Sequence, residues 1–476
     1  MTFSLPTSKF WNPRVLIVIF VLNAFIYTIL LFHSRTFDFG SGRLVDDEVT
    51  IQPIHTTPPP TQPPHTPLIP IDYPHNETPS TSPPVVGKWA FNSTRDSKNF
   101  GLSEEQCTTA FRGLFTEIER AVRYRKTIGQ VRVEEIDISS EKDVATGGMV
   151  RAMILDQQLY IIEAHISLGD HPRMRALATL NAIHRALLTS PVPIPNSEFS
   201  FSVNDILAPS PRPIWALTRL ATEPEKWVMS DFGYWAWSRA LMGGYEEMRA
   251  QIAELEKPFE EKIPKVVWRG DRKNNVNRVK LIAEAEGKEW ADVRDIQWRD
   301  ARHVTGYDAD STITVPEHCL YQFVIQTEGW SYSGRGKYLQ NCNSVVIIPK
   351  RIWIEPQHAL IVSSGPLQNF VEIEEDYSDL ETVMEELLAN PEKAKMIAQN
   401  GVDAFRDRAL TPAAQACYWR KMLVAWAEVS PKAERWEHVE GGRIGKRRGV
   451  DFETYIVKEA IMDPGCTWAQ WFTFKC

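Results

Sequence analysis

A glycine-rich stretch late in the chain, Glu-Gly-Trp-Ser-Tyr-Ser-Gly-Arg-Gly-Lys, contains the residue types that bind an anion. Gly334 and Gly336 let the backbone approach a ligand closely, and the amide groups at the start of a helix favour a negative charge. Arg335 can donate two hydrogen bonds to a diphosphate, while Lys337 adds a second positive charge and Ser333 a hydroxyl. The spacing predicts a diphosphate-binding turn. It is equally compatible with an ordinary glycine turn carrying exposed basic residues.

Two other polar groups stand where predicted strands end. Arg269, Gly270 and Asp271 follow an apolar run, and at the carboxyl edge of a parallel sheet such a turn faces the ligand crevice. Asp205 follows another strand, and a carboxylate beside a crevice can accept the proton of an attacking hydroxyl. An aspartate that caps the next turn is the structural alternative for Asp205.

No side-chain pattern predicts a zinc centre. The 11 histidines are scattered, and none of the six cysteines belongs to a Cys-x-x-Cys pair. In an oxidising compartment an even, scattered set of cysteines favours disulfides, although spacing does not choose the pairing. Asp308 and Asp310 form an Asp-x-Asp pattern, which binds a metal in some sugar transferases, so a metal-dependent enzyme stays an alternative.

These groups need elements that bring them together, and the chain alternates strands with helices. Strands are predicted over 153–166, 197–203, 214–217, 265–268, 321–326 and 344–348. Helices are predicted over 104–126, 171–188, 245–256, 276–286, 380–388, 391–400 and 413–428. Such alternation predicts parallel sheets covered on both faces, in two α/β units of roughly 160 residues each.

Residues 15–32 are an uncharged, largely apolar run, about 27 Å long as a helix and close to the thickness of a membrane core. Lys9 and Arg14 precede it, so the positive-inside bias places residues 1–14 in the cytosol. The run predicts a retained transmembrane signal anchor. A cleaved signal peptide is the alternative, and it is disfavoured because no small-x-small site follows the run.

A proline-rich stem, residues 33–98, is predicted to follow the anchor. Twelve of the 32 prolines fall between positions 53 and 84, which favours an extended segment without a core. Asn76 and Asn92 begin N-glycosylation sequons, which are used only on the lumenal side. Tail, anchor, stem and globular part are the order found in Golgi-resident type II enzymes, with a surface-anchored binding protein as the alternative. The formal net charge of −8 argues against a nucleic-acid-binding protein.

Four motifs agree in order and spacing with one known family. They are Tyr332-Ser333-Gly334-Arg335, Asn343-Ser344-Val345-Val346, Asp376-Tyr377-Ser378-Asp379-Leu380 and Cys417-Tyr418-Trp419. Through them, from residue 265 to 426 and more weakly from 107 to 205, the sequence resembles glycosyltransferase family 90. That family includes the protein O-glucosyltransferases and the fungal capsule-associated xylosyltransferases.

The resemblance implies a GT-B fold, in which two Rossmann-like domains face each other across a cleft. Residues 99–260 would form the N-terminal acceptor domain, residues 261–428 the C-terminal nucleotide-sugar domain, and residues 429–476 an extension. The resemblance also implies inverting transfer, without a metal or other cofactor, from UDP-xylose or UDP-glucose to a hydroxyl of a protein or glycan. A catalytically inactive lectin-like or scaffold protein of the same fold is the alternative.

The resemblance assigns roles by position, with Asp205 matching the general base. The positions that match the donor site are Arg269, Gly270, Asp271, Ser333, Gly334, Arg335, Lys337 and Asp379. Two residues depart from the family pattern: Asn204 replaces the usual Arg before the base, and Asp271 stands where Ser or Thr is usual. Either departure is compatible with a changed donor choice or with loss of activity.

The resemblance also pairs Cys319 with Cys342 and Cys107 with Cys417, and leaves Cys466 with Cys476 by elimination. Soluble members of the family in the endoplasmic reticulum end in a Lys-Asp-Glu-Leu-type signal, whereas this sequence ends in Thr-Phe-Lys-Cys. With the predicted anchor and stem, that ending favours a single-pass type II protein of the Golgi membrane whose catalytic part is lumenal.

Overall fold

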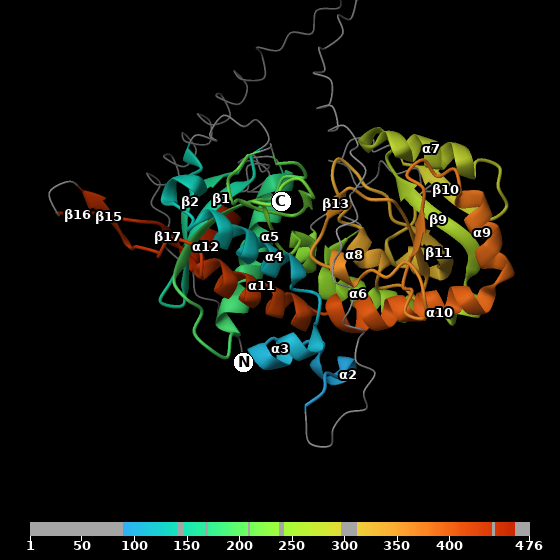
Figure 1. Cartoon of the computed structure of the whole chain (residues 1–476), viewed down its shortest axis with the longest axis horizontal. Helices are drawn as coiled ribbons and strands as arrows, with labels where there is room; N and C mark the ends of the chain where they lie inside the picture. Colours follow the sequence, from blue (N-terminus) through green and yellow to red (C-terminus); the bar gives the residue numbers. More distant parts are fainter. Residues whose placement is uncertain are drawn as a thin grey trace, which may run out of the picture. The chain divides into compact units, whose positions relative to one another are not determined.

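The computed structural model describes residues 89–139, 147–166, 170–207, 210–237, 242–296, 312–439 and 443–461 (Figure 1). Several predictions lie outside these residues. They are the tail (1–14), the anchor (15–32), the stem up to residue 88 with Asn76, the pair Asp308 and Asp310, and the cysteines Cys466 and Cys476. Among the described helices, none combines the length and the apolar character needed to cross a membrane.

The first sheet has six strands in the order β17-β2-β1-β3-β4-β6. These strands are β1 (Met149–Leu155), β2 (Gln158–His165), β3 (Ser197–Ser202), β4 (Trp215–Ala216), β6 (Trp227–Val228) and β17 (Val450–Asp451). β1 pairs antiparallel with β2 and with β3, whereas β3, β4 and β6 pair in parallel. The prediction of a parallel, Rossmann-like sheet in this half is therefore wrong for its central strands.

The physical reason is a tight turn inside the single strand predicted over 153–166. Asp156 and Gln157 have φ values of 50° and 65°, and they join β1 directly to β2. Two residues with positive φ make a hairpin turn, and such a turn leaves no room for the crossover helix that a parallel pair requires. Because neither residue is a glycine or asparagine, the sequence carries no strong hairpin signal at this point.

Helices from both ends of the globular part cover this sheet. They are α3 (Glu104–Ala110), α4 (Thr116–Ile128), α5 (Asp170–Leu188), α11 (Pro412–Ala427) and α12 (Phe452–Ile461). α11 contacts α3, α4 and α5, and its buried side chains join the largest apolar core. The disulfide between Cys107 and Cys417 joins α3 to α11, which confirms the pairing that the family resemblance implied. The predicted helix over 104–126 divides at Gly113, whose φ of 80° is outside the helical range.

The second sheet is entirely parallel, as the alternating pattern predicts, with the order β10-β9-β11-β12-β14. Its strands are β9 (Ile263–Gly270), β10 (Ala291–Asp295), β11 (Tyr321–Ile325), β12 (Val345–Pro349) and β14 (Val371–Ile373). α7 (Val276–Ala285), α9 (Leu380–Ala389) and α10 (Pro391–Gly401) pack in one core with the sheet. Leu339 of α8 (Gly336–Leu339) and Phe370 pack with side chains of alternate strand positions, so both faces are covered.

Several other elements lie outside the two sheets. They are α2 (Ser93–Asp96), β5 (Arg219–Leu220), β7 (Ala236–Trp237), β8 (Gly243–Gly244), α6 (Tyr245–Leu255), β13 (Trp353–Ile354), β15 (Trp436–Val439), β16 (Arg443–Arg447), the 3₁₀ turn Phe232–Tyr234 and the π-helix Val402–Ala409. β5, which lies in the chain between β4 and β6 of the first sheet, pairs with β13, which follows β12 of the second. This pairing ties the two halves of the chain together next to the carboxyl ends of the parallel strands.

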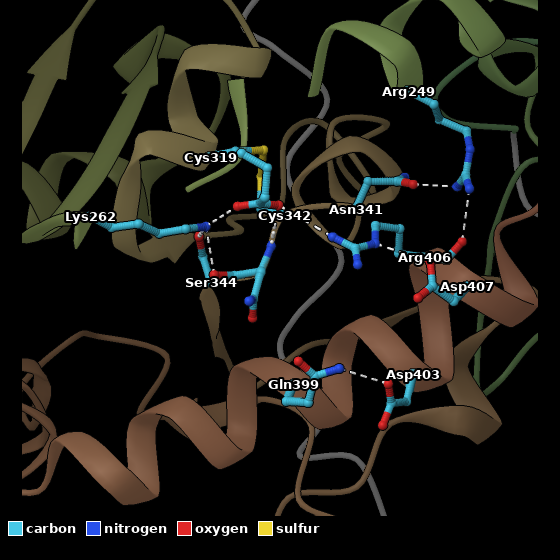
Figure 2. A network of polar contacts seen from close by, with 12 residues as sticks. Arg249, Lys262, Cys319, Asn341, Cys342, Ser344, Gln399, Asp403, Arg406 and Asp407 are labelled. Carbon is cyan, nitrogen blue, oxygen red and sulfur yellow. Dashed lines mark hydrogen bonds and ion pairs between the residues drawn. A yellow bond between two sulfur atoms is a disulfide. The ribbon is translucent and has the colours of Figure 1, made fainter. Parts of the chain in front are cut away.

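A buried polar network holds the segment between β11 and β12 in place. The disulfide between Cys319 and Cys342 closes this segment, again as the resemblance implied. Beside it, the buried ammonium of Lys262 donates to the carbonyl of Asn343 at 2.6 Å and to the hydroxyl of Ser344 at 3.2 Å (Figure 2). A cation with several oxygen partners fixes the loop that leads into β12.

The same network reaches the helices on the other side of the segment. Figure 2 shows Arg249 of α6 pointing to Asn341, and its Nη2 donates to the carbonyl of Arg406 at 3.0 Å. The amide of Asn341 donates in turn to the carbonyl of Lys337 at 2.6 Å. The glycine-rich stretch is therefore supported by α6 and by the π-helix that follows α10.

Candidate active site

The glycine-rich stretch leaves the second sheet at the carboxyl end of β11, as predicted. Gln326 donates from Nε2 to the carbonyl of Ser333 at 2.7 Å, and a Cβ atom on Gly336 would lie 2.7 Å from the same nitrogen. Glycine at this position therefore allows the chain to fold back against Gln326. The helix expected to follow is the single turn α8, and the amide of Gly336 donates to Ser333. The helix N-terminus is thus a smaller part of the site than the sequence suggests.

Arg335 lies at the centre of this stretch, partly buried against Trp268. Its Nη1 donates to the carbonyl of Arg269, and its guanidinium carbon lies 5.8 Å from the centre of the Trp268 ring. Its buried Nε has no partner in the described part of the chain. Burial, followed by the positive charge of Arg278, lowers the pKa of Arg335 to about 9. A side chain whose charged form is destabilised in this way favours the approach of an anion.

Arg278 of α7 is the second cation of the site, and no motif in the sequence predicts it. Its guanidinium lies 5.6 Å from the Trp268 ring and donates to the carbonyls of Asp271 and Glu328, each at 3.0 Å. Burial lowers the pKa of Arg278 to about 10. Neither Arg278 nor Arg335 forms an ion pair with a carboxylate of the described residues. The two guanidiniums therefore form an electropositive pair whose charge the described part of the chain does not neutralise.

Tyr377 lies beside this arginine pair and belongs to the Asp376–Leu380 motif. Its side chain is buried, and burial raises the pKa of its hydroxyl while the charges of Arg278 and Arg335 oppose that rise. Its φ of 63° is unusual for a residue other than glycine. Asp379 of the same motif accepts a hydrogen bond from the amide of Glu374 at 2.9 Å. The motif thus places Tyr377, rather than Asp379, closest to the cations.

Lys337 pairs with a carboxylate of the chain, whereas the spacing of the stretch predicts a diphosphate as its partner. Its side chain is 3% exposed, and Nζ lies 2.9 Å from Oδ1 of Asp231, a residue that precedes the 3₁₀ turn Phe232–Tyr234. Nζ also donates to the carbonyl of Gly334. Because Asp231 already neutralises its charge, Lys337 supports the turn from inside.

The Arg-Gly-Asp segment at the end of β9 also differs from the expectation. The side chain of Arg269 points away from the arginine pair and binds Asp292 of β10, with Nη2 2.8 Å from Oδ2. Burial alone would raise the pKa of Asp292, but the hydrogen bonds from Arg269 and Tyr321 hold it at about 2. A Cβ on Gly270 would lie 2.6 Å from the Trp268 ring. Arg269 and Gly270 therefore shape the site through the position of Trp268 and of the backbone.

The carboxylate of Asp271 does not pair with Arg272 or with Arg335. Its carboxylate accepts a hydrogen bond from the amide of Lys273 at 2.8 Å, and Arg272 instead binds Asp295 at 2.9 Å. Asp271 therefore acts as the cap of a short turn. Its carbonyl, rather than its carboxylate, contacts the arginine pair through Arg278.

Asp205 lies next to the glycine-rich stretch although the two are far apart in sequence. Its side chain is 40% exposed, its Oδ1 lies 2.7 Å from Nη1 of Arg175 on α5, and its carbonyl accepts a hydrogen bond from the hydroxyl of Ser331. Among the described residues, no backbone amide donates to the Asp205 carboxylate, so the capping role is not observed. The preceding Asn204 packs against Gly148, where a Cβ would lie 2.6 Å from its Oδ1.

The sequon at Asn92 lies on the described surface. The exposed side chain of Asn92 accepts from the amide of Arg95 at 3.0 Å through Oδ1, and thereby caps α2. Nδ2, the atom that carries a glycan at a used sequon, has no partner among the described residues. No group of three His, Cys, Asp or Glu side chains suited to a metal occurs in the described ranges.

Comparison with known proteins gives one family. The profile of Glycosyl transferase family 90 matches residues 104–437, which include Arg175, Asp205, Arg278 and Arg335. Protein O-glucosyltransferase 1 of Rattus norvegicus is 22% identical over 174 residues, 36% of this chain and 43% of the relative. An O-glucosyltransferase rumi homolog of Anopheles gambiae is 23% identical over 193 residues, 40% of this chain and 47% of the relative. The chain therefore aligns with less than half the length of each of these proteins.

Proposed function

The chain belongs to glycosyltransferase family 90, and we propose that it is an inverting glycosyltransferase that uses a UDP-sugar. The observation that carries the proposal is the convergence of two kinds of group on one stretch. Asp205 contacts Ser331 at one end of the stretch, and Arg335 lies beside Arg278 at the other. A general base beside an uncompensated pair of cations is what transfer from a nucleoside diphosphate sugar requires.

In the proposed reaction, the oxygen of an acceptor hydroxyl attacks the anomeric carbon of the sugar from the face opposite the diphosphate. The new carbon–oxygen bond forms as the bond between the anomeric carbon and the diphosphate breaks, so the configuration inverts. The Asp205 carboxylate takes the proton of the hydroxyl, and the electron pair of the broken bond leaves with UDP. Arg278 and Arg335 stabilise the negative charge that develops on UDP.

We further propose that the two sheets correspond to the two halves of a GT-B architecture. The all-parallel second sheet supports its role as the nucleotide-sugar half, because ligands bind at the carboxyl ends of such strands. The mixed first sheet and α11, which returns to it, form the acceptor half with Asp205. Here the first sheet departs from a Rossmann-like order at its antiparallel strands β1, β2 and β3.

The proposed donor is UDP-glucose or UDP-xylose, and the proposed acceptor is a hydroxyl of a protein or glycan. The names of the relatives, which are O-glucosyltransferases, favour glucose and a protein acceptor. We place the activity in the secretory pathway, in a type II protein of the Golgi membrane anchored by residues 15–32. The two disulfides support an oxidising compartment.

The proposal is tested by measuring donor cleavage and UDP binding with the purified full-length chain. We expect UDP to bind and one UDP-sugar of a panel to be cleaved, with activity unchanged by a chelator. In Asp205→Asn, kcat should fall by about 10²- to 10⁴-fold while the Kd for UDP stays within about twofold, because the amide keeps the shape but accepts no proton. The control is Lys288→Ala, which removes an exposed cation beyond α7 that pairs with Glu381.

Each other outcome points to a named alternative. UDP binding without cleavage of any UDP-sugar would favour an inactive lectin-like or scaffold protein of the same fold. Loss of activity with a chelator and recovery with Mn²⁺ would favour a metal-dependent transferase that uses Asp308 and Asp310. A collapse of UDP affinity in Asp205→Asn would show that Asp205 has a structural role.

A further inference from the structure

A buried cluster of charges connects the candidate base to the glycine-rich stretch. Asp231 is its centre: Oδ1 lies 2.9 Å from Nζ of Lys337, Oδ2 accepts from the hydroxyl of Tyr332, and the amide of Gly233 donates to Oδ1 at 2.5 Å. The side chains of Asp231 and Lys337 are 7% and 3% exposed. Lys337 also donates to the carbonyl of Gly334, so the cluster is fastened directly to the backbone of the stretch.

Arg175 of α5 joins this cluster to Asp205. Nη1 donates to Oδ1 of Asp205 at 2.7 Å and to the carbonyl of Val203 at 3.1 Å, and the guanidinium carbon lies 4.9 Å from the centre of the Phe232 ring. Burial alone would lower the pKa of Arg175, but the negative groups around it, Asp205 and Asp231 among them, outweigh burial and raise it. Arg175 is therefore a cation held by the carboxylate of Asp205 and by the aromatic face of Phe232.

The residue next to Asp205 in the chain does not supply this cation. Asn204 carries no charge and packs against Gly148, and the guanidinium that reaches Asp205 comes instead from thirty residues earlier. One bond of Arg175 holds the carboxylate and the other holds the backbone just before it. An exposed Asp side chain has several rotamers of similar energy, and this pair of bonds selects one of them.

We propose that Arg175 is a positioning residue that orients the Asp205 carboxylate relative to the glycine-rich stretch. Because Phe232 follows Asp231 directly, the same short segment holds Arg175 by its ring and Lys337 by the adjacent carboxylate. Through Arg175 and Lys337, this one segment therefore helps to hold both Asp205 and the turn that carries Arg335. The inference rests on the proposed function, in which Asp205 is the general base.

The kinetic test compares Arg175→Met and Arg175→Lys with wild type in the full-length chain. Methionine keeps apolar contact with Phe232 but removes the charge, so kcat should fall by about 10- to 100-fold, the loss expected when a reacting group is misplaced by about 1 Å. The donor KM and the Kd for UDP should stay within about twofold, because Arg175 does not touch the arginine pair. Arg175→Lys should recover part of kcat, since it restores a cation without the planar geometry.

The matched control is Arg185→Met, ten residues later on the same helix. Arg185 also packs on aromatic rings, 4.4 Å from the centre of Phe100 and 4.5 Å from that of Trp235, and it has no contact with Asp205. We expect its kcat and KM to match those of wild type. Arg175→Met with wild-type kcat would overturn the inference, and so would a fall in kcat matched by an equal loss of UDP affinity.

A second measurement does not depend on activity. Hydrogen–deuterium exchange of the peptides that contain 203–207 and 329–334 should rise in Arg175→Met and stay unchanged in Arg185→Met. Only the first variant loses the bonds to Asp205 and to the carbonyl of Val203. Unchanged exchange in an Arg175→Met enzyme that is still active would refute the positioning role of Arg175 and leave the proposed function intact. If wild type neither bound UDP nor cleaved a donor while exchange rose in Arg175→Met as expected, the positioning role of Arg175 would be supported and the proposed function would fail.

Discussion

Replacing Arg335 by methionine should separate the effect of this side chain on function from its effect on stability. Arg335 has no carboxylate partner among the described residues, its Nε is unpartnered, and Arg278 lies close enough to lower its pKa further. In the proposed reaction it stabilises the charge that develops on UDP. Removing one such donor costs about 2–4 kcal/mol of transition-state stabilisation. That loss corresponds to a fall of about 30- to 1000-fold in kcat/KM.

Without ligand, Arg335→Met should not lower the stability of the folded protein. The pKa of Arg335 in the folded protein, about 9, lies below its ordinary value. The protonated side chain therefore costs folding free energy at every pH below about 9. Methionine removes that cost and loses the bond to the carbonyl of Arg269, so we expect the unfolding temperature without ligand to stay at or above that of wild type. Saturating UDP, which should stabilise wild type by about 2.7 kcal/mol at 100 times its Kd, should stabilise the variant far less.

Arg420→Met is the matched control, because Arg420 is also a buried arginine whose pKa is lowered by burial. Its guanidinium donates to the carbonyls of Phe100 and Leu102, the latter at 2.8 Å, next to the disulfide between Cys107 and Cys417. The loss of these two hydrogen bonds should outweigh the relief of burying a charge, so this variant should lower the unfolding temperature and keep the stabilisation by UDP. If Arg335→Met unfolded like Arg420→Met, or kept wild-type kcat/KM, the anion-site reasoning would be refuted.

Two further predictions concern stability. Burial raises the pKa of Glu328 to about 7, so the free energy of unfolding should fall as the pH rises from about 4.5 to 7. In Glu328→Gln this dependence, measured by urea titrations, should flatten, and an unchanged slope would contradict the prediction. The disulfide between Cys319 and Cys342 closes 23 residues, so replacing both by serine should lower the free energy of unfolding by about 3 kcal/mol in denaturant titrations, and free thiols at these two positions in the native protein would contradict the pairing.

The features that could be predicted from the sequence are those set by local pattern. Apolar runs between helical segments predicted the parallel second sheet. The hypothesis of one site that contains Asp205 and the glycine-rich stretch agrees with the hydrogen bond from Ser331 to the carbonyl of Asp205. The family resemblance supplied both observed disulfides. The hairpin at Asp156 and Gln157 was missed because alternation looks the same in one long strand and in two short ones.

Several side chains of the candidate site have partners far away in the chain, which no sequence pattern predicts. Lys337 is neutralised by Asp231, more than a hundred residues earlier, and Arg269 is turned away by Asp292 on β10, a charged strand without an apolar run. Arg175 and Arg278 lie on amphipathic helices, where an arginine usually faces solvent. No spacing rule distinguishes them from their neighbours, because long-range packing decides where each guanidinium points.

A structure of the full-length chain with UDP bound would decide whether Asp205 and the arginine pair serve one transferase site. We expect diphosphate oxygens within hydrogen-bonding distance of the guanidiniums of both Arg278 and Arg335. The end of the diphosphate that would carry the sugar should face the Asp205 carboxylate, with the bond from Arg175 retained. A UDP molecule bound away from both arginines, or with its diphosphate turned away from Asp205, would show that these residues do not form one site.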